Sequence, residues 1–232
     1  MDRTEILVRE IRASAGFRVQ NELELLSDNF YAFDINYKHW KKYLSNFKNT
    51  ESLLKLWDQK NRAGFMLTLN ELTRLLLNFL ASATSLVSVT RNSVPIWYQH
   101  TDFAKEYEVK KEKLAKDDEC RFIEDLRNYS QHHRLPFARG KMQLRTNELT
   151  GQFVLNRNML NSWDGWAKGK TFLKGRNEDV DLESLIDSYY NKILDFHKWI
   201  FARIQEINSE EIRKTEVLQE ELENLLNKIF DS

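Results

Sequence analysis

The distribution of proline and glycine constrains this chain more than any other feature of its sequence. Among 232 residues there are two prolines, Pro95 and Pro136, and five of the seven glycines lie between positions 140 and 175. Both residue types interrupt helices, so their scarcity elsewhere allows long, uninterrupted helices. We therefore expect long helices towards both ends of the chain, and turns and irregular structure between residues 140 and 175.

Apolar residues recur at helical spacing between Gly64 and Asn92, which predicts a long helix with one buried face. The predicted stripe consists of Leu69, Leu72, Leu76, Phe79, Ala83 and Leu86. The most apolar part, residues 75–89, is short and is interrupted by Asn78 and several hydroxyl residues. It is therefore expected to be a core helix and not a membrane span, and Pro95 is expected to end it.

A second long helix is expected to begin after Thr101, which is a suitable N-cap residue. Its first half carries the charge run KEYEVKKEKLAKDDE, which predicts a solvated face stabilised by close opposite charges. Apolar residues return at Phe122, Ile123 and Leu126, so the second half is expected to reach the core. Pro136 is expected to end this helix.

The periodicity changes beyond the second proline. Apolar and polar residues alternate in MQLRT and QFVLN, and the segment NELTG between them contains Asn and Gly, which predicts a β-hairpin near 141–157. A short helix is expected around 158–169, a longer one from Asp181, and a last one after Ser209. The expected fold class is mainly α, a helical bundle with two long core helices and a small β-hairpin insertion.

The balance of charge limits the kinds of partner that the chain can bind. Lys plus Arg number 35 and Asp plus Glu number 35, so the net charge is zero. This argues against a protein that coats nucleic acid or an anionic membrane through bulk charge. With Cys120 as the one cysteine, no intrachain disulfide can form, and a reducing compartment is expected. The N-terminus lacks the apolar core of a signal peptide, so the expected location is the cytoplasm, without a membrane partner.

Neither a metal site nor a cofactor site is predicted. His39, His100 and His197 are scattered, and no spacing typical of zinc ligands occurs. His197 lies among aromatic residues in DFHKW and is expected in the core or at its boundary. The segment KGKTF at 168–172 lacks the pattern of a phosphate-binding loop.

The segment RNYSQHHRLP, residues 127–136, concentrates the groups that carry chemistry. Arg127 presents a planar, permanently charged guanidinium that suits a phosphate. His132 or His133 can take or give a proton near neutral pH. Together they are the minimum for cleaving RNA without a metal, since histidine activates the ribose 2′-hydroxyl and arginine neutralises charge on the phosphate. Asn128 would position the phosphate or the imidazole.

The segment RNYSQH resembles the signature of HEPN domains, in which an arginine, often followed by a polar residue, precedes a histidine by a few positions. The order of elements is also similar, with a long apolar helix before the helix that bears the motif. The resemblance covers roughly residues 60–200, and helices over 3–60 and 209–230 would pack on that core within a single domain, residues 1–232. It implies a metal-independent endoribonuclease of a bacterial toxin–antitoxin, antiviral or stress system, or a relative that has lost catalysis and serves as a scaffold.

The resemblance assigns the functional set to Arg127, Asn128 and His132, with His133 as the alternative histidine. It implies RNA as substrate, a homodimer, and a protein partner such as an antitoxin or defence component. Because Arg127 and His132 lie about 140° apart around a helix, a two-fold axis would bring Arg127 of one chain near His132 of the other. In HEPN toxins that act with a small nucleotidyltransferase, a tyrosine follows the histidine by two positions. Arg134 stands there, so regulation through such a tyrosine is not expected.

Plainer interpretations stay open for these residues. Positive charges near the end of a helix interact favourably with its dipole, so RNYSQHHR also suits a helix C-terminus without catalysis. Trp163 and Trp166 could stack on bases, but their spacing favours packing on one helical face.

Overall fold

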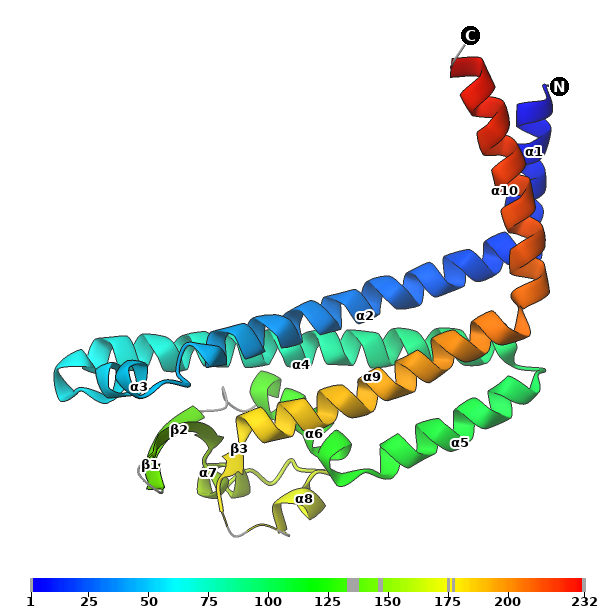
Figure 1. The fold of residues 1–232 in the computed structure, drawn as a ribbon. Coiled ribbons are helices and arrows are strands. Elements are labelled where there is room, and N and C mark those ends of the chain that lie inside the picture. Colours follow the sequence, from blue (N-terminus) through cyan, green and yellow to red (C-terminus); the bar gives the residue numbers. More distant parts are fainter. Residues whose placement is uncertain (1, 133–137, 146–147, 175, 177, 231–232) are drawn as a thin grey trace. The chain divides into compact units, whose positions relative to one another are not determined.

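A computed structural model describes residues 2–132, 138–145, 148–174, 176 and 178–230. It is mainly helical with one small sheet (Figure 1), which confirms the predicted fold class. The chain divides into two compact units, which are described separately: residues 1–29 with 195–232, and residues 30–194. Helices α2 (Ala15–Ser45) and α9 (Leu182–Ile207) each contribute to both units.

The first unit pairs the two terminal helices, α1 (Arg3–Ala13) and α10 (Ser209–Phe230). The hydroxyls of Ser14 and Thr215 share a hydrogen bond of 2.8 Å where the chain passes from α1 to α2. A Cβ on Gly16 would lie 2.2 Å from a backbone oxygen of α10, so no larger residue fits at this close approach.

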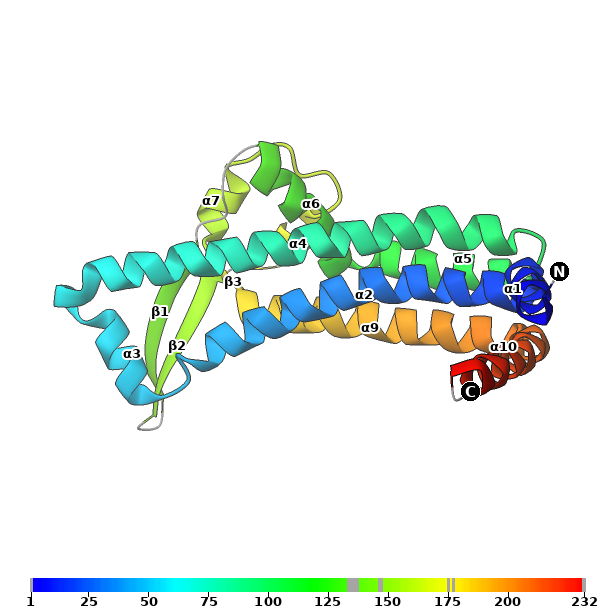
Figure 2. The same ribbon diagram turned by 90° about the horizontal axis from the view of Figure 1, so that it is seen from above.

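The second unit holds the remaining elements. Its helices, besides the adjoining parts of α2 and α9, are α3 (Thr50–Trp57), the 3-10 turn η1 (Gln59–Asn61), α4 (Arg62–Tyr98), α5 (Asp102–Lys116), α6 (Asp118–His132), α7 (Arg157–Asn161) and α8 (Lys170–Lys174). The strands β1 (Ala138–Arg145), β2 (Glu148–Leu155) and β3 (Val180–Asp181) pair antiparallel in that order. Figure 2 shows the β1–β2 hairpin beside α3 and the first turns of α4, with which it is in contact.

An aromatic cluster joins α2, α4 and α9 in the core of this unit. The ring of Phe33 on α2 lies 5.2 Å from that of Phe79 on α4 and 5.5 Å from that of Tyr190 on α9, measured between centroids. Phe79 also meets Tyr189 edge-on at 6.1 Å. All residues of the predicted α4 stripe are buried, and α4 packs against α6, where Leu126 is buried. The predicted buried stripe of α4 and the return of the later helix to the core at Leu126 are thereby confirmed.

Two helix boundaries differ from the prediction. Pro95 does not end the long helix, because α4 continues for three residues beyond it. A proline so close to a helix end removes one backbone donor and leaves most hydrogen bonds intact. The helix expected from Thr101 to Pro136 is two helices: Asp117 is extended between α5 and α6, and its carboxylate accepts a hydrogen bond of 3.0 Å from the Cys120 N–H. Thr101 caps α5 as predicted, and Pro136 lies outside the described residues.

The predicted hairpin is confirmed, and its strand β2 begins earlier than the sequence indicates. Strand pairing places Arg145 opposite Glu148 and Met142 opposite Gly151, so most of NELTG belongs to β2. The two residues between the strands lie outside the described part of the chain. A Cβ on Gly151 would lie 2.3 Å from Cδ2 of Leu53, so glycine allows α3 to approach β2 closely. Strand β3 spans only two residues, too few to leave an alternating pattern in the sequence.

The segment Gln59–Tyr98 is long and apolar enough to cross a membrane, judged by length and composition alone. Its most apolar window has a mean hydropathy of 1.4, and 39% of that window is buried within the structure. The core helix of a soluble protein passes the same test.

Candidate functional site

The segment that the sequence singles out lies at the C-terminal end of α6. Arg127 is half-buried, and its Nη1 donates a hydrogen bond of 3.3 Å to Oδ1 of the exposed Asn128. His132 is exposed and is the last residue of α6. His133, the alternative histidine, lies outside the described residues. The arginine and the asparagine therefore meet at one turn, and the described histidine stands further along at the helix end.

Arg127 and Asn128 line a pocket of about 180 Å³ that is walled by α4, α6 and α9. Glu124 lies one turn before them on α6, and Tyr189 of α9 completes the wall. His132 is not part of the described lining. The structure thus combines two of the predicted site residues in one cavity and leaves the histidine outside it.

Helix α4 supplies a wall that was not predicted from the sequence. Thr84, Ser88 and Arg91 line the pocket at positions i, i+4 and i+7, which share one face of a helix. This row of polar residues in an otherwise apolar helix is the signal that could have revealed them. Arg91 is exposed and makes no hydrogen bond or ion pair within the described part of the chain.

The ionised groups of the pocket leave it with an excess of positive charge. Its described lining carries two guanidinium groups and one carboxylate. The Nε of Arg127 is buried and has no hydrogen-bond partner among the described residues. Glu124 as a whole is exposed, but its carboxyl group is partly desolvated. Desolvation raises the pKa of this carboxyl group, and the positive charges of Lys168 and Arg91 only partly offset the increase. Cationic donors that face a cavity without a carboxylate partner suit an oxyanion ligand.

A buried carboxylate beside the motif fixes the loop that packs on α6. Asp125 is 8% exposed, and its Oδ2 accepts hydrogen bonds from the N–H groups of Ala167 at 3.0 Å and Gly169 at 2.7 Å. A Cβ on Gly169 would lie 3.1 Å from that oxygen, so a larger residue would press on the contact. The same loop carries Trp166, whose ring stacks on Tyr129 of the motif with centroids 5.5 Å apart. Asp125 therefore supports the helix turn that presents the candidate site.

The two tryptophans pack together, but not on one helical face as expected. Trp163 meets Trp166 edge-on at 4.9 Å, in the irregular segment that follows α7. That helix is much shorter than the one expected around 158–169. Trp166 is buried and stacks on the rings of Tyr129 and Phe122, so it is a core residue and not a surface for base stacking.

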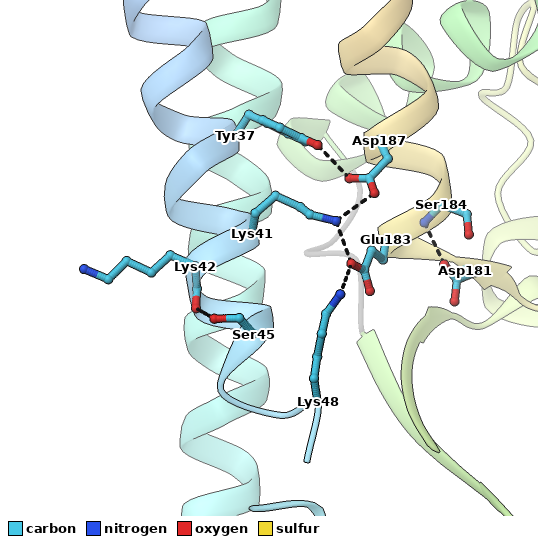
Figure 3. Close-up of polar contacts among 9 residues, drawn as sticks. All are labelled: Tyr37, Lys41, Lys42, Ser45, Lys48, Asp181, Glu183, Ser184 and Asp187. Atoms are coloured by element: carbon cyan, nitrogen blue, oxygen red, sulfur yellow. Dashed lines mark hydrogen bonds and ion pairs between the residues drawn. The ribbon is translucent and has the colours of Figure 1, made fainter. Parts of the chain in front are cut away.

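A larger pocket, of about 410 Å³, lies between the end of α2, strand β2 and the start of α9. Figure 3 shows the charged residues gathered there. Lys41 contacts Glu183 at 2.6 Å and Asp187 at 2.7 Å, and Lys48 also contacts Glu183, at 2.9 Å. Tyr37 donates a hydrogen bond of 3.1 Å to Asp187. These contacts join α2 to α9 as a clamp.

Lys41 and Glu183 of this clamp stabilise each other's charged forms. Desolvation alone would lower the pKa of Lys41, but hydrogen bonds to Asp187 and Glu183 outweigh it and raise the pKa. Desolvation alone would raise the pKa of Glu183, but hydrogen bonds from Lys41 and Lys48 outweigh it and lower the pKa. These charges already satisfy one another, whereas the two arginines of the smaller pocket make no described ion pair. This contrast identifies the smaller pocket as the candidate functional site.

Among the described residues, no group of three or more His, Cys, Asp or Glu side chains is placed to hold a metal ion. His197 is buried, as predicted. Cys120 is also buried, and burial raises the pKa of its thiol to about 12, which keeps the thiol protonated at neutral pH.

No family model, no curated protein and no solved structure matches this chain.

Proposed function

We propose that this protein is a HEPN-like endoribonuclease that cuts RNA without a metal ion. The observation that carries the proposal is the pocket between α4 and α6, where Arg127, Asn128 and Arg91 surround a space of about 180 Å³. A guanidinium fork matches the geometry of a phosphate, and RNA presents one phosphate at every nucleotide. Because the net charge of the chain is zero, the attraction for RNA is local to this pocket.

The proposed reaction is an in-line attack of the ribose 2′-oxygen on the adjacent phosphorus. His132 takes the proton of the 2′-hydroxyl as the new O2′–P bond forms and the P–O5′ bond breaks. Water carries the proton that the His132 imidazolium releases to the leaving 5′-oxygen, which completes the step and restores the neutral imidazole. Arg127 neutralises the charge that builds on the phosphate, and Asn128 holds the phosphate or the imidazole in place. The products are a 2′,3′-cyclic phosphate end and a 5′-hydroxyl end.

The active form in this proposal is a homodimer. Arg127 and His132 lie about 140° apart around one helix, and His132 is outside the described lining of the pocket. A two-fold axis close to the RNYSQHH segments would place Arg127 of one protomer near His132 of the other, through a single self-complementary surface. We further propose a cytoplasmic role in a bacterial stress or antiviral system, with an antitoxin or another defence protein as partner.

The test is a cleavage assay on end-labelled RNA in the presence of EDTA. Wild-type protein should cut and leave 2′,3′-cyclic phosphate ends. Arg127→Ala and His132→Ala should each lower the rate by about 100-fold or more, and His133→Ala should lower it only mildly. Arg213→Ala, on an exposed position of α10, is the control. Activity abolished by EDTA and restored by magnesium would reject the mechanism. If His133→Ala lowered the rate more than His132→Ala, the catalytic role would belong to His133.

A second candidate is a catalytically silent HEPN-like helical protein that binds another protein or assembles as a dimer. The zero net charge favours it. So does Glu124, whose carboxylate lines the pocket and repels a phosphate when it is ionised. Growth inhibition on expression separates the two candidates: only a nuclease predicts toxicity that both Arg127→Ala and His132→Ala relieve.

A further inference from the structure

We infer that Arg91 and Arg127 form a receptor for a single phosphate group, and that Arg91 is a substrate-binding residue. The identity of that phosphate as part of an RNA backbone rests on the proposed function. The receptor itself rests on the geometry of the pocket between α4 and α6.

Arg127 brings to the pocket a buried donor without a described acceptor. The Nε of Arg127 is buried, and no described residue accepts its hydrogen bond. A buried donor on a charged group is seldom left without an acceptor. The contact from Nη1 to Asn128 is long, at 3.3 Å, and the side chain lines the pocket. A phosphate oxygen is the acceptor that suits the fork formed by Nε and a neighbouring Nη.

A second arginine reaches the pocket from another helix. Arg91 lines the same pocket from α4 and makes no hydrogen bond or ion pair with the described residues. Ser88, nearly one turn earlier, adds a hydroxyl to this wall. Two guanidinium groups on two helices can bind different oxygens of one tetrahedral group. Phosphate offers both the charge and the number of oxygens that such a pair can use.

The size of the pocket also favours a small ligand. Sites for drug-sized ligands enclose roughly 300–1,000 Å³, whereas this pocket has about 180 Å³. The pocket is therefore smaller than such sites and suits a compact group such as a phosphate. The receptor therefore binds the backbone and not the base, and phosphate contacts carry no sequence information.

Glu124 provides an opposing charge within the same pocket. Its ionised carboxylate repels an incoming phosphate, and a neutral amide of similar shape does not. Glu124→Gln should therefore strengthen phosphate binding, while Arg91→Gln weakens it. Opposite responses from two residues of one pocket distinguish a receptor from a structural polar network, in which either substitution would only destabilise.

The experiment is calorimetric titration of the full chain, in EDTA at neutral pH, with two probes. One probe is inorganic phosphate, and the other is a 2′-O-methyl RNA oligonucleotide, which lacks the attacking hydroxyl. Arg91→Gln should weaken both by about ten-fold or more, and Arg91→Lys, which keeps the charge but loses the fork, by less. Glu124→Gln should tighten both, and the exposed control Arg213→Gln should change neither. Melting temperatures are measured for every variant.

Wild-type affinity in a stably folded Arg91→Gln variant would overturn the receptor, as would a wild-type protein that binds neither probe. If Arg91→Gln does not fold, Arg91→Lys and Glu124→Gln decide: affinity shifts in opposite directions support the receptor, and unchanged affinities overturn it. Binding of phosphate without RNA supports a receptor for a free phosphate compound. Binding of RNA through Arg91 without cleavage leaves the receptor standing and rejects the nuclease. If Arg91→Gln cuts RNA as fast as the wild type and binds both probes with unchanged affinity, the receptor is rejected and the nuclease stands.

Discussion

Replacement of Asp125 tests whether the loop that packs on α6 depends on one buried carboxylate. Its Oδ2 accepts two backbone hydrogen bonds, from Ala167 at 3.0 Å and from Gly169 at 2.7 Å. The residue is 8% exposed, so water does not readily replace that oxygen. In Asp125→Ala, both backbone donors lose their acceptor.

The magnitude follows from those two bonds. A hydrogen bond to a charged group contributes about 1.5–3 kcal/mol, and relief from burying a carboxylate offsets part of the sum. We expect a net loss of about 2–4 kcal/mol in the free energy of unfolding for Asp125→Ala. For a chain of this length each kcal/mol lowers the melting temperature by about 2–4 °C, so the expected decrease is about 4–16 °C. Asp125→Asn keeps an uncharged acceptor and should lose less.

The assay is thermal unfolding followed by near-ultraviolet circular dichroism, because the loop carries Trp166, stacked on Tyr129. Loss of the Trp166 signal at or before global unfolding would show that the loop detaches. Asp164→Ala, at an exposed position of the same loop, is the matched control and should stay within about 0.5 kcal/mol of wild type. The reasoning is refuted if Asp125→Ala melts like this control with its aromatic signal intact.

Leu76→Asp places an unpaired charge at a core position that is 1% exposed and should lose about 3–5 kcal/mol of stability, whereas Asn78→Asp on the exposed face of α4 should unfold like wild type. If Leu76→Asp left the melting temperature unchanged, the face of α4 that carries Leu76 would have to be exposed to solvent. Because Lys41 and Lys48 lower the pKa of Glu183, its contribution to stability is complete above the ordinary value of 4.5 and is lost as pH falls through the lowered value. In Lys41→Met, the free energy of unfolding should fall less steeply at acidic pH than in the wild type, as measured by urea unfolding at a series of pH values. A pH profile identical to that of the wild type would contradict the role of Lys41. Light scattering at micromolar concentration should give twice the 27.7 kDa chain mass, and a clean monomer would remove the proposed shared site.

The helical architecture could be predicted because its signals are local. The stripe along α4 and the cap at Thr101 depend on residues close together in sequence, and both are confirmed. The break at Asp117 depends on a distant contact as well as on its own cap. Lys192 of α9 contacts the Asp117 carboxylate at 2.7 Å from 75 positions away. No local pattern contains that contact, so the charge run of α5 seemed to continue into α6.

The candidate site could be predicted only in part, for the same reason. Arg127 and Asn128 stand in one polar segment, and the structure places both at a pocket. Arg91 comes from α4, and its approach to Arg127 depends on how α4 and α6 pack. Helix periodicity reveals which face of each helix is apolar, but not which turn of one helix meets which turn of the other.

Within one protomer the pocket gathers groups that suit a phosphate, and two residues compete for the role of general base in the proposed reaction. Glu124 lines the pocket and its pKa is raised, which suits a general base, yet its charge repels the ligand. His132 carries no such penalty, but it lies outside the described lining and needs a second protomer. The shared-site proposal therefore expects Glu124→Gln to bind RNA more tightly and still cut it, while His132→Ala binds and does not cut. Tight binding without cleavage in Glu124→Gln would assign the base to Glu124, and the dimer would then no longer be required for catalysis.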